Sequence, residues 1–306
     1  MTNSTESNRF VNGAIGVGAG WATYKYLPKV ISKPYGRYFM GEVKSIPGNM
    51  QQQYWEAGQK AFINSGLSQK GINIVDINSK NVKTVISDTI TKAENFTQNI
   101  YKKLGIDISV IKNKEKPRAK WKYILFGESS KDKLTNALCQ IYKGNSAGFH
   151  PASKSVYVNK EKMGFSVFHE MGHAVNATEK GIRKVLSYGR QGTALLVPRL
   201  LVAALLKKRQ PESDAEPKKV QRKKNFLKDN IGILSFACML PTVAEEGLAS
   251  INGAKLAKNV MNADMYKKLN KINAKAFGSY AILAALIGIF TQLAVNIKDK
   301  VAAPKN

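Results

Sequence analysis

The stretch Phe165-Ser-Val-Phe-His-Glu-Met-Gly-His-Ala-Val175 holds two of the three histidines of the chain, in the pattern H-E-x-x-H. On a helix, residues four positions apart lie on one face, so His169 and His173 can bind the same metal ion. Glu170 follows His169 directly, where its carboxylate could take a proton from a water activated by that metal. The pattern therefore predicts a metal-binding helix, with zinc as the expected ion and hydrolysis as the expected chemistry. The alternative is a helix whose histidines only cap or pack.

The composition predicts a chain with a hydrophobic core and a strong positive charge. Hydrophobic residues make up 43% of the 306 residues, and 48 Lys and Arg against 21 Asp and Glu give a net charge of +27. Such a charge favours nucleic acid or anionic lipid as a partner. Because it is spread along the whole chain without a nucleic-acid module, we expect membrane lipid and no nucleic acid. The two cysteines, Cys139 and Cys238, do not indicate a disulfide framework.

The first 184 residues divide into two predicted parts. Residues 1–27 form a polar tail followed by fifteen uncharged residues, Phe10 to Tyr24. This segment falls short of the roughly 17–25 residues of a spanning helix, so we expect a marginal membrane segment or anchor. Residues 28–184 have mixed helix and strand patterns. The expected helices cover residues 50–61, 82–104 and 134–141, and the expected strands cover residues 72–77 and 121–126.

The segment before the histidines adds a second pattern. Residues 155–159 predict a short strand, and Asn159 can cap a helix that runs to about Lys180 and stops at Gly181. A strand leading into an H-E-x-x-H helix resembles the zincin metallopeptidases. In that family an edge strand pairs with an extended substrate backbone, and Val156 to Val158 are the candidates for that role here. An ordinary sheet strand is the alternative, since strand addition needs a free edge.

The third metal ligand has three candidates. A catalytic zinc site usually has three protein ligands and one open position. Glu179 lies where metzincins place their third ligand, with Asn176 in place of a glycine. Gluzincins carry a glutamate on a second helix in a pattern like E-x-x-A/S-D, and Glu246-Gly-Leu-Ala-Ser250 resembles this, with Ser250 in place of Asp. We therefore expect Glu246, with its neighbour Glu245 and Glu179 as the alternatives.

Residues 185–251 predict an apolar helical hairpin between the histidines and Glu246. Residues 194–206 are apolar except for Arg199, and a hydrophilic loop with nine Lys or Arg residues follows. A second apolar segment, Ile231 to Ala244, is expected to be broken by Pro241 and to end at the glutamate pair. Two membrane passes would return the chain to the side that it left. The alternative is a buried hairpin of a soluble protein, because both segments are short for membrane spans.

Residues 252–306 predict two helices. A Lys-rich helix from Leu256 to Lys275 comes first and is expected on the membrane surface or beside the active site. Ala276 to Ile297 follows with 22 residues and no charge, which is the strongest transmembrane candidate in the chain. The loop from Lys207 to Asp229 is basic, but the catalytic region is just as basic, so the positive-inside rule does not predict an orientation.

This layout resembles the integral-membrane zincins, the family of the type I CAAX prenyl protease and the bacterial heat-shock membrane peptidase. Those proteins also place an apolar hairpin between H-E-x-x-H and the third-ligand glutamate. The resemblance covers residues 155–297, and it departs at Thr178 and Ser250, where acidic residues are usual. It implies an α+β, mostly helical fold, with a zincin-like catalytic domain, a small sheet and transmembrane helices.

The resemblance also implies a function. It predicts a membrane-associated, zinc-dependent metalloendopeptidase, with Glu170 as the catalytic base and His169, His173 and Glu246 as zinc ligands. Its substrate would be a peptide or protein. The alternative is a basic membrane-associated binding or scaffold protein with a degenerate or structural metal site.

Overall fold

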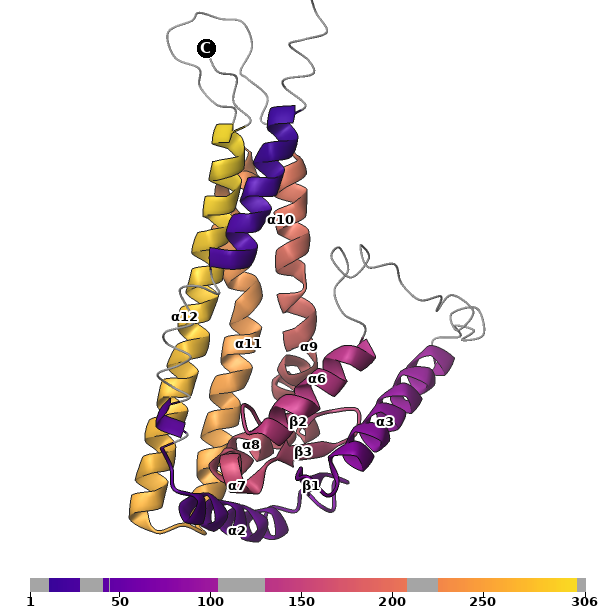
Figure 1. The fold of residues 1–306 in the computed structure, drawn as a ribbon, viewed down its shortest axis with the longest axis vertical. Helices are drawn as coiled ribbons and strands as arrows, with labels where there is room; N and C mark the ends of the chain where they lie inside the picture. Colours follow the sequence, from indigo (N-terminus) through magenta and orange to yellow (C-terminus); the bar gives the residue numbers. More distant parts are fainter. Residues whose placement is uncertain (1–10, 28–40, 44, 104–129, 208–224, 302–306) are drawn as a thin grey trace, which may run out of the picture. The chain divides into compact units, whose positions relative to one another are not determined.

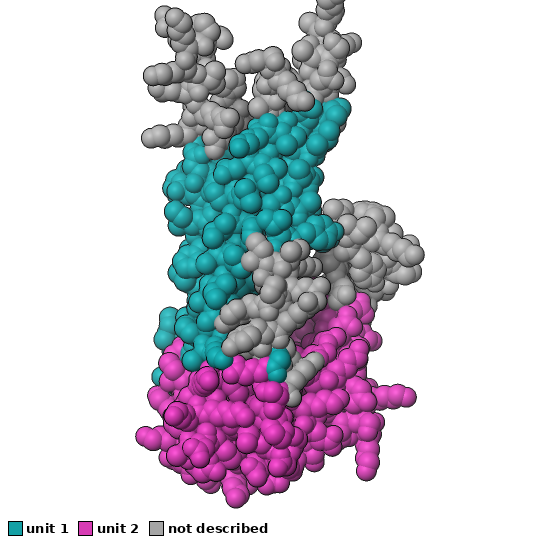
Figure 2. Space-filling view, turned by 60° about the vertical axis from the view of Figure 1, so that its left-hand side comes forward, with its two compact units in different colours: residues 1–41, 180–247, 274–306 teal, residues 42–179, 248–273 magenta. Residues whose placement is uncertain are grey.

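The structure, a computed structural model, describes residues 11–27, 41–43, 45–103, 130–207 and 225–301 (Figure 1). The chain divides into two compact units, coloured teal and magenta in Figure 2. Unit 1 contains residues 1–41, 180–247 and 274–306, and unit 2 contains residues 42–179 and 248–273. The described residues are mostly helical with one small sheet, as predicted.

Unit 2 contains the sheet and the histidine helix. Its first elements match the predicted helices and strands, while the strand expected at residues 121–126 lies outside the described residues. The elements are α2 (Gly48–Asn64), β1 (Asn73–Asp76), α3 (Val82–Lys103), α6 (Ser130–Lys143), β2 (Gly148–His150), β3 (Ser155–Val158), α7 (Lys160–Met163), η1 (Gly164–Ser166) and α8 (Val167–Thr178).

The sheet has the strand order β1-β3-β2. Strand β3 pairs in parallel with β1, where Val156 lies opposite Ile74, and antiparallel with β2, where Val156 lies opposite Phe149. The prediction that Val156 to Val158 form a free edge is therefore wrong, because both sides of β3 are already paired within the sheet. The alternative of an ordinary sheet strand is confirmed.

A hydrophobic cluster holds β3 against α3 and α6. Ile77, Leu138, Ile141 and Tyr157 are its buried members. The Tyr157 hydroxyl lies 2.7 Å from Oγ1 of Thr89 on α3, so this buried polar group is satisfied within the cluster. The amphipathic stripe that predicted α3 thus faces the sheet, and α8 packs against β3.

The single helix expected from Asn159 to Lys180 is divided into α7, η1 and α8. Asn159 does cap α7, since its Oδ1 accepts a hydrogen bond from the Lys162 amide at 3.2 Å. The division occurs at Gly164, where a side chain would overlap the Gln51 carbonyl of α2. The amide of Phe165 donates instead to Oε1 of Gln51 at 3.1 Å. The close approach of α2 therefore tightens this turn, and α8 starts afresh at Val167.

The end of α8 lies close to its predicted position. The helix ends at Thr178, and Gly181 follows with φ of 78°, a left-handed conformation that glycine adopts without strain.

Unit 1 is built from long helices. They are the N-terminal helix (residues 11–27), α9 (Ile182–Ala194), α10 (Leu196–Leu206), the first part of α11 (Phe226–Lys258) and the last part of α12 (Ala263–Val301). Helix α11 continues through Pro241, so the predicted break is wrong. A proline removes one backbone hydrogen bond, and the many remaining bonds and the packing of a 33-residue helix offset that loss.

The Lys-rich helix is not a separate element. Its first residues form the end of α11, and the rest begins α12, which continues without interruption through the apolar segment. Asn262 explains the boundary, because its Oδ1 caps α12 by accepting from the Met265 amide at 2.9 Å.

Close glycine contacts pack the helices of unit 1. On the N-terminal helix, Gly16 lies against the carbonyl of Lys298 and Gly20 against that of Ala294, both on α12. Gly232 of α11 and Gly288 of α12 lie against each other's carbonyls. Spacing of small residues by four positions lets helix backbones approach closely, as in membrane helix pairs.

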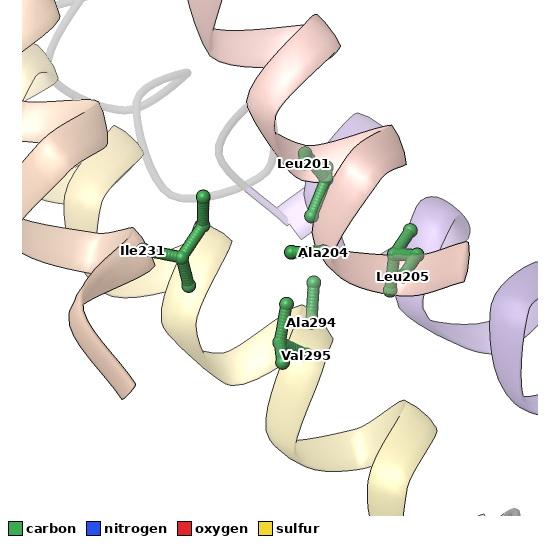
Figure 3. Packing of buried hydrophobic residues seen from close by; sticks show 6 residues of the cluster. All are labelled: Leu201, Ala204, Leu205, Ile231, Ala294 and Val295. Carbon is green, nitrogen blue, oxygen red and sulfur yellow. The ribbon is translucent and has the colours of Figure 1, made fainter. Parts of the chain in front are cut away.

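Side chains of α10, α11 and α12 form the core of unit 1 (Figure 3). Six buried side chains form it: Leu201, Ala204, Leu205, Ile231, Ala294 and Val295. Val17, Trp21 and Tyr24 of the N-terminal helix pack against this cluster.

A buried ionic cluster lies in the same unit. Lys228 Nζ lies 2.7 Å from Oδ1 of Asp299, and Lys298 Nζ lies 3.3 Å from the same oxygen. Lys298 Nζ also donates to the carbonyl of Lys207 at 3.3 Å. The cluster therefore ties α10, α11 and α12 together with charges that are almost fully removed from solvent.

Among the described residues, α11 and α12 are long and apolar enough to cross a membrane. The apolar segment Gly192–Leu206 is shorter.

Candidate metal centre

Helix α8 directs both motif histidines toward one point. Their Nε2 atoms lie 3.1 Å apart, and their rings meet edge to face with centroids 4.7 Å apart. The helical spacing of four residues produces this convergence. One ring can donate a hydrogen bond to the other at this distance, and a metal ion would replace that contact.

Glu246 of α11 completes a group of three donors. One ligand atom from each of His169, His173 and Glu246 lies within 4.8 Å of the other two. Glu246 is buried, His173 is buried and His169 is half-buried. The predicted candidate thus lies with the histidines in the structure, and the group could hold a metal ion.

Neither alternative ligand belongs to this three-donor group. Glu179 would need a turn at Asn176, yet α8 stays helical through Thr178 and places Asn176 in a buried helical position. Glu245 precedes Glu246 on α11, where one step along a helix turns a side chain by about 100°.

The donor set fits zinc in kind and spacing. Two ligands at about 2.0–2.1 Å from a tetrahedral zinc ion lie about 3.4 Å apart, close to the observed separation of the two Nε2 atoms. Two imidazoles and one carboxylate are also the ligands of catalytic zinc sites with a fourth, open position. The residues present therefore fit zinc, although the group itself does not specify which metal.

Two glycines bring α8 and α11 together at this centre. A Cβ on Gly172 would overlap the carbonyl oxygen of Ala249, and a Cβ on Gly253 would overlap the carbonyl oxygen of Phe168. The two helices can meet backbone to backbone only because these positions lack side chains. The sequence analysis missed this role, although Gly172 lies between the two histidines.

Ser250 lies one turn after Glu246 and contacts the first histidine. Its Oγ lies 3.2 Å from Nδ1 of His169. A metal-binding histidine usually donates its second N–H to such a partner, which fixes the tautomer and the ring orientation. The hydroxyl thus occupies the position expected for an acidic residue and can still accept this hydrogen bond.

Glu170 is buried on α8 with 7% of its surface exposed. It follows His169 by one position and precedes His173 by three, so it borders the face that carries the histidines. A carboxylate in this position suits proton transfer to and from a group held at the donor set.

His150, the third histidine, has a separate local role. Its Nδ1 lies 3.0 Å from Oγ of Ser153 and accepts a hydrogen bond from the Ser153 amide at 3.3 Å. Burial lowers the pKa of His150 below its usual 6.5. The neutral ring therefore stabilises the turn between β2 and β3.

Comparison of the chain with protein-family models, with curated proteins and with solved structures gives no match. The fold and the site define a mostly helical protein with two long apolar helices and a His-His-Glu group that could hold a metal ion.

Proposed function

We propose that the protein is a membrane-associated, zinc-dependent metalloendopeptidase. The observation that carries this proposal is the convergence of the ligand atoms of His169, His173 and Glu246 to within 4.8 Å. Glu170, which lies between the two histidines in the sequence, supports the proposal further. A purely structural metal site has no need of a buried carboxylate at this position.

The chain's own residues divide the chemistry among them. His169, His173 and Glu246 would hold zinc, which when bound polarises a scissile carbonyl and lowers the pKa of water. Glu170 takes a proton from the attacking water and returns it to the leaving amine. Ser250 keeps His169 in the tautomer that offers Nε2 to the metal.

The distribution of exposed apolar side chains supports insertion of unit 1 in a membrane. Most of the exposed large hydrophobic residues among the described positions belong to unit 1. Ile233 is 69% exposed on α11 and Ile289 is 60% exposed on α12, the two helices long enough to span a bilayer. A soluble protein rarely leaves large apolar patches in water, so we propose an integral, multi-pass protein whose basic residues attract anionic lipid.

The decisive test compares Glu170→Gln with the unchanged protein, purified in detergent. Glu170→Gln should bind zinc normally and lose cleavage of an unfolded protein substrate, because it keeps the donor set and removes the base. Glu161→Gln, on the exposed face of α7, is the matched control and should cleave normally. Full activity of Glu170→Gln would contradict the mechanism.

Zinc content identifies the third ligand and tests the alternative function. Glu246→Gln should lose stoichiometric zinc, whereas Glu179→Gln should retain it. A protein that binds zinc at this group but cleaves no peptide under any condition would instead be the basic membrane-associated scaffold with a structural metal site.

A further inference from the structure

We infer that a buried amide pair outside the donor set, Asn176 and Asn252, sets the register of α8 on α11 and thereby positions the metal ligands. This inference rests on the proposed zinc site and adds to it two residues that act through the ligands rather than on the metal.

The pair is a direct contact between the two helices. Nδ2 of Asn252 donates to Oδ1 of Asn176 at 2.7 Å, and both residues are buried, with 6% and 0% of their surfaces exposed. Asn176 lies seven residues after His169, two helical turns along the same face. Asn252 lies two residues after Ser250, which contacts His169.

Close backbone contacts also form part of this helix crossing. Gly172 faces the backbone of Ala249, and Gly253 faces the backbone of Phe168. The amide pair and the contact between Ser250 and His169 add side-chain hydrogen bonds between the two helices.

A buried asparagine pair is an effective register device because any other register loses the hydrogen bond between the two side chains. Single asparagines at helix interfaces specify alignment in this way, at some cost in stability. In the observed register, α11 brings Glu246 into the group with His169 and His173. A shift of α11 along α8 would displace the carboxylate from the two Nε2 atoms.

The test separates positioning from simple stability. We would measure zinc affinity by chelator competition and thermal unfolding for Asn252→Leu, Asn176→Leu and the double Leu variant. Each single variant removes this buried hydrogen bond while keeping one of its two amides, so it should be less stable and bind zinc about 10- to 100-fold more weakly. The double variant removes both buried amides and should regain stability but still bind zinc weakly.

Recovery of zinc affinity together with stability in the double variant would overturn the inference, as would normal zinc affinity in both single variants. Asn273→Leu is the matched control, because Asn273 is buried in the same unit and its Nδ2 has no hydrogen bond. This variant should bind zinc normally. If the unchanged protein binds no zinc, the proposed function itself fails, an outcome distinct from any difference among the variants.

Discussion

Oγ of Ser250 on α11 lies 3.2 Å from Nδ1 of His169 on α8. If Nδ1 carries the proton and donates it to the hydroxyl, the lone pair of His169 is on Nε2, the atom that lies 3.1 Å from Nε2 of His173. One hydroxyl of α11 is thus linked to the tautomer of the first histidine. A carboxylate would make this link more strongly, because a charged acceptor binds an N–H more tightly than a neutral one.

Replacing Ser250 by Ala should weaken zinc binding about 10- to 100-fold, because His169 loses the partner that orients its ring. Ser250→Asp should keep or strengthen binding. Chelator competition on purified protein measures both effects. Thr178→Ala is the control, since the Thr178 hydroxyl bonds only to carbonyls of its own helix in the contacts described. Equal zinc affinity in Ser250→Ala and the unchanged protein would show that the hydroxyl does not support the ligand.

Gly172→Ala should separate α8 from α11, because the added methyl group would overlap the carbonyl oxygen of Ala249. Overpacking of this kind costs about 1–3 kcal/mol, and here it also moves Glu246 away from the histidines. The unfolding temperature and the zinc content should both decrease. Gly189→Ala on α9 has no atom within 4 Å of the added carbon and should be neutral or slightly stabilising. A Gly172→Ala protein with unchanged zinc content would contradict the close crossing.

Local patterns predicted most elements of unit 2. The stripe of apolar residues from 82 to 104 matches α3, and the run from Ser155 matches β3. The failures had long-range causes. Division of the helix after Asn159 depends on Gln51, more than a hundred residues earlier, and the central place of β3 depends on pairing with β1. Neither contact leaves a periodic signal near the residues that it affects.

Removing the carboxylate of Asp299 should destabilise unit 1 strongly. Asp299→Ala leaves the ammonium groups of Lys228 and Lys298 buried near each other without the anion between them. Loss of one partner from a buried ion pair costs about 3–5 kcal/mol. Thermal unfolding in detergent should therefore shift downward, whereas Lys300→Met, at an exposed site on the same helix, should change stability by less than about 0.5 kcal/mol. Similar unfolding temperatures for the two variants would argue against a buried cluster.

If α11 and α12 both cross the bilayer, the two ends of α12 must lie on opposite sides. Single cysteines at Asn259 and Lys300, in a background with Cys139 and Cys238 replaced, report this directly. In sealed vesicles a membrane-impermeant maleimide should label one position, and the other only after detergent is added. Both sites are exposed in the structure, so poor accessibility does not explain a difference. Labelling of both without detergent would contradict the two-pass arrangement.

Acid should weaken the turn that His150 stabilises. Its pKa is lowered by burial, so the unfolded chain takes up a proton at higher pH than the folded protein. Stability is therefore fully present above about pH 6.5 and decreases as the pH falls from there toward the folded pKa. His150→Gln should lose this part of the pH dependence in thermal unfolding at pH 8 and pH 5.5. An identical slope in both proteins would exclude His150 as its source.

The ligands of the candidate metal centre could be predicted from the sequence, whereas the contacts that support them could not. Spacing alone placed His169 and His173 on one face, and ligand type together with the E-x-x-A/S-D pattern selected Glu246, 73 residues after His173. The supporting contacts could not be predicted, because Gly172 and Asn176 are weak helix formers whose roles arise only against Ala249 and Asn252, on a distant helix. Patterns report which side chains could act together, whereas close contacts depend on how two distant helices cross.

The order of the donor residues along the chain matters during synthesis. His169 and His173 leave the ribosome well before Glu246, which follows 73 residues later on α11. A nascent chain therefore has only two of the three donors until α11 has been made and packed onto α8. The group could act in hydrolysis only after that stage. Chains that end before Glu246 would therefore lack the third donor and would be inactive.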